Sequence, residues 1–210
     1  MARDRLQGDR LRAGLGSITI GCEIVVLEET GSTNDVVREM AEKGSAEGLV
    51  VLAEHQTAGR GQRGKRWESP PHKGLWLSIL LRPAIPVGES ARLTSWAART
   101  VASTIEKSCN LKLTIKLPND IYLARRKIAG VLVEMRAQPQ VDHLAILGIG
   151  LNVNQAPEDF PQELRDQATS LAIATGRSQD RNEIAIALLR NLDRTYGQFR
   201  MSTRARELRE

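Results

Sequence analysis

The chain has 210 residues, of which 41% are hydrophobic and 26% charged, and its formal net charge is +5. This composition is that of a soluble globular protein, with enough chain for one domain and a substantial core. The basic residues are concentrated at the two ends and in residues 55–73, where five cationic residues accompany one acidic residue. That distribution argues against a broad nucleic-acid-binding face and favours a small anionic ligand held by one loop.

The sequence also bears on cellular location. No apolar run approaches the roughly 18 residues that a membrane helix needs, and the N-terminus lacks the apolar core of a signal peptide. We therefore expect a cytoplasmic protein without membrane association. Cys22 and Cys109 show no spacing typical of a metal or redox site, which favours two reduced thiols and leaves one disulfide as the alternative.

The first predicted elements are a strand and a short helix. Residues 1–16 are charged and interrupted by glycines, so we expect them to be flexible. Residues 22–29 are largely apolar and predict a strand. Residues 32–44 predict a helix, because Ser32 or Thr33 can cap its start and a glycine can end it.

Two strands and a longer helix follow. Residues 48–54 predict a buried strand, and residues 74–82 predict a second strand that Pro83 ends. Residues 89–108 carry apolar and small side chains at helical spacing, which predicts a helix with one buried face. That face consists of Leu93, Trp96, Ala97, Thr100, Val101 and Ile105.

The last third of the chain predicts three strand segments and a helix. Residues 112–123 read as a strand interrupted by a proline turn, and residues 127–136 and 144–154 read as paired strands. Residues 183–199 have the apolar spacing of an amphipathic helix. Because strands and helices do not alternate strictly, we expect an α+β fold with a mixed or antiparallel sheet flanked by helices, as a single domain over all 210 residues.

One loop has an unusual composition. Residues 57–71, TAGRGQRGKRWESPP, place three glycines among four cationic residues and then a tryptophan. Glycine lets the backbone approach a ligand closely, and the cations attract an anion. The pattern predicts a loop that is mobile when empty and ordered by an anionic ligand; a basic, flexible surface loop is the alternative.

Polar residues at predicted strand ends are further candidates for a site. Ser32, Thr33 and Asn34 follow the first strand, and Gln56 leads into the loop. In KLPND, residues 116–120, proline fixes a turn that brings an asparagine and an aspartate to the surface. A helix cap and an ordinary turn explain these residues equally well.

The paired strands carry the remaining candidates. Lys127 begins the largely apolar segment KIAGVLVE, where Gly130 predicts close approach of a ligand or another strand. Residues 148–154, GIGLNVN, place two glycines in an apolar strand and end it with asparagines.

The order and spacing of these motifs are more specific than any one of them. Ser-Thr-Asn, Gln-(x)2-GRGxxG-(x)2-W, K-x-P-N-D, KIAGVLVE and GIGLNVN together resemble the catalytic domain of biotin protein ligases, also called biotin–[acetyl-CoA-carboxylase] ligases. The resemblance runs from about residue 24 to 200. It implies a class II aminoacyl-tRNA-synthetase-like fold, shared by biotin and lipoate ligases.

The resemblance also implies a reaction. ATP and biotin give biotinyl-5′-AMP and pyrophosphate, with magnesium as the companion of ATP. The adenylate then acylates a lysine of the biotin carboxyl carrier protein of acetyl-CoA carboxylase. A homodimer stays open, and neither a nucleic-acid partner nor a metal site made by the protein is expected.

Site residues follow from the same resemblance. Lys127 is implied to contact the biotin carboxylate and the α-phosphate, and Arg60 to belong to the loop that closes over the adenylate. Trp67 is implied to pack under that loop. The positions implied to bind biotin or its adenylate are Ser32, Thr33, Asn34, Gln56, Gly59, Arg60, Gly61, Gln62, Trp67, Lys127 and Gly130. The positions implied on the nucleotide and magnesium side are Asn119, Asp120 and Asn152.

The chain departs from the family pattern in several places. Gln62 and Lys65 stand where arginine is frequent, and Leu117 stands where the family motif has tryptophan. We expect the usual C-terminal β-barrel to be absent or truncated, because no strands are predicted after Met201. The roughly 20 residues before the first strand are too few for a winged-helix DNA-binding domain, so we expect no repressor function.

Three alternatives to biotin ligation remain. A lipoate or octanoyl ligase shares the fold and the adenylate chemistry. A non-catalytic module that binds biotin or a carrier would fit the departure at Gln62 and the missing barrel. A nucleic-acid-binding protein rests only on the basic loop and ends.

Overall fold

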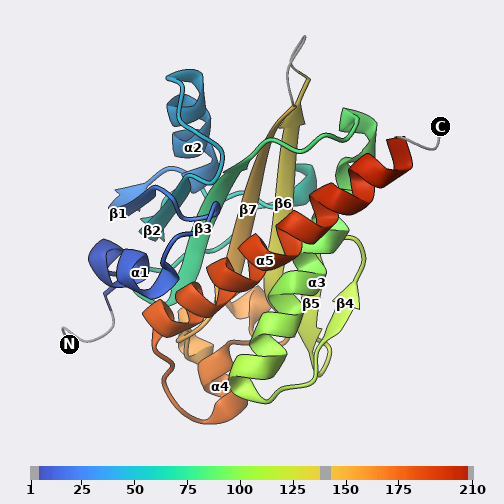
Figure 1. Ribbon diagram of the computed structural model, residues 1–210. Helices are drawn as coiled ribbons and strands as arrows, with labels where there is room; N and C mark the ends of the chain where they lie inside the picture. The colour runs from blue at the N-terminus through green and yellow to red at the C-terminus, as the bar shows by residue number, and fades with distance from the viewer. Residues whose placement is uncertain (1–4, 138–142, 208–210) are drawn as a thin grey trace.

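The computed structural model describes residues 5–137 and 143–207 and consists of one twisted sheet covered by helices (Figure 1). The sheet has seven strands in the order β1-β2-β3-β7-β6-β5-β4. In that order their bounds are Ile24–Thr30, Val50–Gln56, Gly74–Leu81, Leu144–Asn152, Arg126–Arg136, Asp120–Leu123 and Thr114–Lys116. β1 and β2 are parallel and all other neighbours are antiparallel, which confirms the predicted α+β fold with a mixed sheet.

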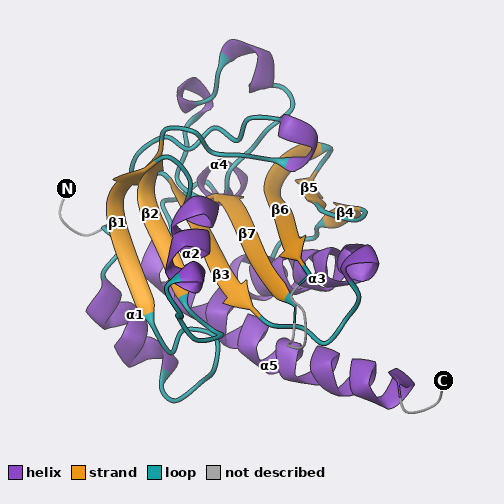
Figure 2. Ribbon diagram, turned by 90° about the horizontal axis from the view of Figure 1, so that it is seen from above, coloured by secondary structure: helices purple, strands orange, loops and turns teal. Residues whose placement is uncertain are grey.

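Helices cover the two faces of the sheet unequally. Figure 2 shows α2 (Thr33–Glu42) on one face, and α1 (Gly8–Leu15), α3 (Ser90–Cys109) and α5 (Arg181–Glu207) on the other. A short fourth helix, α4 (Leu171–Thr175), precedes α5. None of the helices in the described part of the chain is long and apolar enough to cross a membrane.

Side-chain alternation along the strands divides the core into two clusters. In β2, Val50 and Leu52 belong to the large cluster under α1, α3 and α5, whereas Val51 belongs to a small cluster under α2. Successive residues of a strand point to opposite faces, so both faces of this strand are apolar. The predicted buried face of α3 also packs into the large cluster, with Trp96 partly buried against it.

The N-terminal segment corrects one expectation. Predicted to be flexible, it forms α1, in which Leu11 is fully buried and Leu15 nearly so. Arg10 pairs with Asp180 and Glu183 at the start of α5. Charge and glycine content indicated local flexibility, but this helix is stabilised by packing on distant elements; residues 1–4 lie outside the described residues.

Other predictions are confirmed with shifted bounds. The interrupted strand over residues 112–123 is two strands, β4 and β5, joined at Pro118. β6 and β7 pair antiparallel as expected. Cys22 and Cys109 are free thiols. Among the described α-helices, only α1 and α4 were not predicted.

Candidate active site

The alternation of side chains leaves an open space on the α2 face of the sheet. In β7, Leu144 and Ile146 fill this face, but the next two positions that point to it are Gly148 and Gly150. Gly150 lies opposite Gly130 of β6. A cavity lies above these glycines, and its empty space, part of which is open to solvent, measures about 470 Å³.

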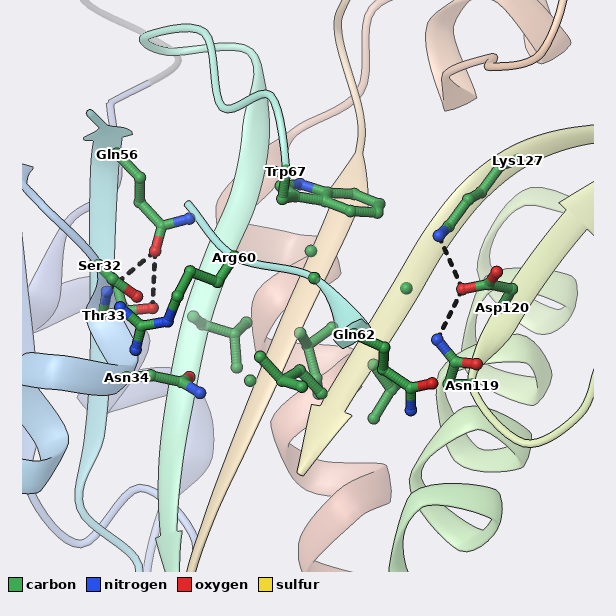
Figure 3. Close-up of a pocket in the computed structure, with 18 residues that line it drawn as sticks. Ser32, Thr33, Asn34, Gln56, Arg60, Gln62, Trp67, Asn119, Asp120 and Lys127 are labelled. Atoms are coloured by element: carbon green, nitrogen blue, oxygen red, sulfur yellow. Dashed lines mark hydrogen bonds and ion pairs between the residues drawn. The ribbon is translucent and has the colours of Figure 1, made fainter. Parts of the chain in front are cut away.

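The cavity gathers most of the residues implied by the resemblance (Figure 3). Those that line it are Ser32, Thr33, Asn34, Gln56, Arg60, Gly61, Gln62, Trp67, Asn119, Asp120, Lys127 and Gly130. Gly59 and Asn152 do not line it. Leu77, Val131, Leu132 and Ile149 also line it, so it combines an apolar wall with polar side chains.

One end of the cavity is a network of polar side chains at the start of α2. The backbone N–H and the hydroxyl of Thr33 both donate to Gln56 Oε1, at 2.9 and 3.1 Å. The Thr33 hydroxyl also lies 2.6 Å from Ser78 Oγ, which donates to Asn34 Oδ1 at 2.6 Å. Ser32 occupies the N-cap position, but its side chain makes no capping bond, so the predicted cap is wrong for this hydroxyl.

Asn34 leaves one donor for a ligand. Its side chain is buried, and its Nδ2 has no hydrogen-bond partner among the described residues. A buried donor without a partner costs about 1–3 kcal/mol, which a bound acceptor such as a carbonyl or ureido oxygen would relieve. This end of the cavity therefore suits a neutral polar group.

The opposite end of the cavity carries Lys127. Its Nζ lies 2.7 Å from Asp120 Oδ1, which also accepts from Asn119 Nδ2 at 2.8 Å. The ammonium group is 5.1 Å from the centre of the Trp67 ring, a cation–π distance. Figure 3 shows the two ends of the cavity with Trp67 between them.

A β-bulge aims Lys127 into the cavity. β5 pairs with Lys127 and with Ala129, but its register skips Ile128. Ile128 and Ala129 both face the large core cluster, so Lys127 and Gly130 share the cavity face although they are three residues apart. The backbone of Lys127 is also fixed by residues after β7, because its N–H donates to Gln167 O at 2.7 Å.

Trp67 explains the glycines of the paired strands. A methyl group at Gly130 would lie 2.9 Å from the Trp67 ring, and one at Gly150 would lie closer still. The ring also packs edge-on against Trp76, with centroids 6.4 Å apart. The sequence predicted that a ligand or another strand comes close to Gly130, whereas in the structure the ring of Trp67 does so. The ring packs on the sheet at the end of the loop.

Arg60 is held by carboxylates of two other elements. Its two terminal nitrogens bind Asp35 of α2 at 2.6 and 2.7 Å, and one of them lies 3.7 Å from Glu134 of β6. The bond from Arg60 holds the pKa of Asp35 below its ordinary value, and the bond to Asp35 raises the pKa of Arg60. Both groups are therefore charged at neutral pH.

The loop itself is a narrow hairpin. The N–H of Gly61 donates to Lys65 O at 2.6 Å, and the N–H of Trp67 donates to Gly59 O at 2.9 Å. A methyl group at Gly59 would meet Trp67 O, so this glycine permits the hairpin to close and does not contact the cavity. Repulsion among the cationic side chains of the loop is reduced, because Arg60 and Arg66 each have an acidic partner. Mobility of the empty loop stays a prediction.

Asn152 lines the second, wider cavity described below, and its buried side chain is held by two hydrogen bonds. Its Nδ2 donates to Thr169 O at 3.0 Å, and its Oδ1 accepts from Gln155 Nε2 at 2.9 Å. Thr169 in turn donates its N–H to Lys127 O at 2.9 Å. In this arrangement the amide supports the segment that fixes Lys127, and a nucleotide contact by Asn152 stays a prediction.

A second, wider cavity adjoins the first beyond Trp67 and Lys127. It is partly open to solvent, and six cationic side chains line it against three acidic ones. The cationic residues are Arg63, Lys65, Arg66, Lys116, Arg125 and Lys127. In the part of the chain that the structure describes, no group of three or more His, Cys, Asp or Glu side chains could hold a metal ion.

Two residues that shape the site, Asp35 and Ser78, were not predicted from the sequence, and Gly148 was noted there without a role. Asp35 follows Ser-Thr-Asn directly, but its partner Arg60 is 25 residues away. Ser78 is a buried hydroxyl in the apolar strand GLWLSILL, a signal that could have been noticed. A side chain at Gly148 would meet the Asn34 amide, so this glycine makes room for the polar end.

Comparison with known proteins gives consistent matches. A Bacillus subtilis (strain 168) protein named bifunctional ligase/repressor BirA is 37% identical over 195 residues, which cover 93% of this chain and 60% of that protein. A Mycobacterium tuberculosis protein named biotin–[acetyl-CoA-carboxylase] ligase is 36% identical over 208 residues, covering 94% and 75%. The chain thus spans about three fifths of the length of the first relative.

Structural comparison and the family profile agree with these matches. The biotin protein ligase from Aquifex aeolicus in complex with biotin and ATP superposes with a TM-score of 0.75 and 31% identity, over 86% of this chain and 72% of that one. The profile of the biotin/lipoate A/B protein ligase family matches residues 26–152, which include most of β1, all of β2 to β7 and the lining of the cavity. The chain therefore belongs to the biotin/lipoate A/B protein ligase family.

Proposed function

We propose that the chain is a biotin–[acetyl-CoA-carboxylase] ligase that couples biotin to a carrier lysine through biotinyl-5′-AMP. The observation that carries the proposal is the layout of one cavity: neutral polar groups at one end, an apolar wall, and Lys127 at the other end beside a cationic second cavity. Biotin has a polar ureido ring, an apolar chain and a carboxylate in the same order. The names of the relatives support the same substrate and carrier.

The polar end would recognise the ureido group. Asn34 Nδ2 supplies a donor that no described residue uses, and Thr33 and Gln56 are held in place by their mutual hydrogen bonds. A buried donor that only the correct ligand can satisfy discriminates strongly against a ligand that lacks the acceptor. Lipoate carries a dithiolane in place of the ureido ring, so this end favours biotin over the lipoate or octanoyl alternative.

The cationic end would promote the first step. A carboxylate oxygen of biotin attacks the α-phosphorus of ATP, the bond to the β-phosphate breaks, and pyrophosphate leaves. Lys127 lies where these two anionic groups would meet, and its charge is aimed at the oxygens on which negative charge increases. Charge-assisted hydrogen bonds of this type contribute about 1.5–3 kcal/mol each.

Magnesium would arrive with ATP. Magnesium is commonly bound by one or two carboxylates together with substrate phosphates, and Asp120 with Asn119 is the nearest such group to Lys127. In the second step, the amine of a carrier lysine attacks the biotinyl carbonyl and AMP leaves. We place this reaction in the cytoplasm. Light scattering of the purified chain decides whether two copies form a dimer.

The test uses purified protein with biotin, MgATP and a biotin carboxyl carrier domain. We expect biotin-dependent ATP–pyrophosphate exchange and a carrier heavier by one biotinyl group. Lys127→Ala should lower exchange about 100-fold or more, because at least one charge-assisted bond to the reacting groups is lost together with the cation–π contact. Lys107→Ala, an exposed lysine in the last turn of α3, is the matched control.

Two outcomes would count against the proposal. Exchange that depends on lipoate and not on biotin would assign the chain to the lipoate branch of the family. Biotin binding without any exchange would leave a binding module, the non-catalytic alternative.

A further inference from the structure

The guanidinium of Arg60, which lines the cavity, closes a network of four charged side chains. Asp35 Oδ1 accepts from Arg38 at 2.5 Å, and Arg38 donates its other nitrogen to Glu134 at 2.6 Å. Arg60 binds both oxygens of Asp35 and also approaches Glu134. The network therefore joins α2, β6 and the loop, three elements that are far apart in the sequence.

Asp35 is placed to hold the tip of the loop. At its start, the loop is fixed to the end of β1 by backbone bonds from Thr57 to Thr30 and from Ala58 to Gly31. Beyond that point the hairpin bonds join the loop only to itself, whereas the bidentate pair joins it to α2. In Figure 3, Arg60 lies beside Ser32, Thr33 and Asn34, so the side chain spans from the loop to the polar end of the cavity.

We propose that Asp35 is a positioning residue that holds Arg60, and with it the loop, across the occupied cavity and so slows the escape of the acyl-adenylate. The holding of the loop is a property of the chain alone; its effect on the adenylate rests on the proposed function. A planar guanidinium fork on a carboxylate fixes orientation as well as distance, which a single ionic contact does not.

The charges facing this pair support a holding role. Asp35 faces Arg38 and Arg60, and Arg60 faces Asp35 and Glu134, so each cation is shared between two carboxylates. When the Asp35 charge is removed, Glu134 is the remaining carboxylate of the network. It lies 3.7 Å from Arg60. Because the Arg60 and Asp35 side chains are 36% and 41% exposed, we expect an effect of about three- to tenfold and not a hundredfold one.

The first experiment needs no ligand. Trypsin cuts after Arg63, Lys65 and Arg66, which are exposed at the tip of the loop. Asp35→Asn should speed cleavage there about three- to tenfold. Asp9→Asn is the matched control, because Asp9 pairs with Arg12 at the same i,i+3 spacing on a helix but is 99% exposed and far from the loop. Equal cleavage of the wild type and Asp35→Asn overturns the proposal.

The second experiment measures the adenylate directly. Wild type, Asp35→Asn, Arg60→Gln and the double variant are loaded with labelled synthetic biotinyl-5′-AMP and chased with an excess of unlabelled compound. We expect Asp35→Asn to release the label about three- to tenfold faster, and to have no further effect when Arg60 is already glutamine, because residues that act through one contact are not additive.

Each other result has a definite meaning. An Asp35→Asn effect of the same size with and without Arg60 would make the residue merely structural and overturn the proposal. Slower release would mean that Asp35 competes with the ligand for Arg60, which also overturns it. A wild type that binds no biotinyl-5′-AMP refutes the proposed function, while the trypsin experiment still decides whether Asp35 holds the loop.

Discussion

Gly150→Ala tests the packing that supports Lys127. The added methyl group would lie 2.8 Å from Trp67 Cζ2 and nearer still to two other ring atoms. Carbon atoms in proteins pack at about 3.5–4.0 Å, so the ring must retreat by about 1 Å or the strands must separate. β7 cannot yield easily, because it is paired with β3 on one side and with β6 on the other.

The cost can be estimated from the contacts that the ring would lose. Overpacking a well-packed site costs about 1–3 kcal/mol. A displaced ring also weakens the edge-on contact with Trp76 and the cation–π contact with Lys127, each about 0.5–1.5 kcal/mol when intact. We expect Gly150→Ala to lower the free energy of unfolding by about 2 kcal/mol, a large share of the 5–15 kcal/mol typical of a domain.

Urea unfolding monitored by tryptophan fluorescence measures this difference. Gly88→Ala is the matched control: nothing lies within 4 Å of its added methyl group, so its stability should stay within about 0.5 kcal/mol of the wild type. In a Trp67→Leu background the methyl group has room, and Gly150→Ala should then cost much less. A Gly150→Ala protein as stable as Gly88→Ala, or a cost that Trp67→Leu leaves unchanged, would refute the packing argument.

Two further predictions concern charged groups. Glu54→Gln should lower the free energy of unfolding by about 3–5 kcal/mol in the same urea assay, because the fully buried Arg181 would lose the carboxylate 2.7 Å from its Nη1. Glu28→Gln, which removes an exposed partner of Arg5, should cost less than about 1 kcal/mol, and equal costs would contradict the assignment. The bond from Arg60 is the main reason why the folded-state pKa of Asp35 lies below its ordinary value of 3.8. The contribution of Asp35 to stability is therefore complete above the ordinary pKa and is lost as the pH falls through the folded-state pKa. The stability difference between the wild type and Asp35→Asn should therefore be constant from about pH 5 to 8 and shrink in acid, and a difference that grows in acid would contradict this sign.

The sequence predicted the elements that are marked by a local or periodic pattern of apolar side chains. Largely apolar runs located β2 and β3, which are buried on both faces, and helical spacing located α3 and most of α5, each of which has a buried face. The order of the short motifs predicted the family, and the cavity brings most of their residues together.

The sequence alone determined the mixed fold, the family and the residue types available at the cavity. Tertiary structure decided which of those residues meet. Lys127 and Gly130 share a face only because the register skips Ile128, and the glycines of β6 and β7 lie close to Trp67, which approaches from a separate loop. Arg60 binds Asp35, which is 25 residues away in the sequence, and α1 is held through the ion pair of Arg10 with Asp180. Contacts between distant segments depend on the assembled sheet and its register, and no local pattern of side chains encodes them.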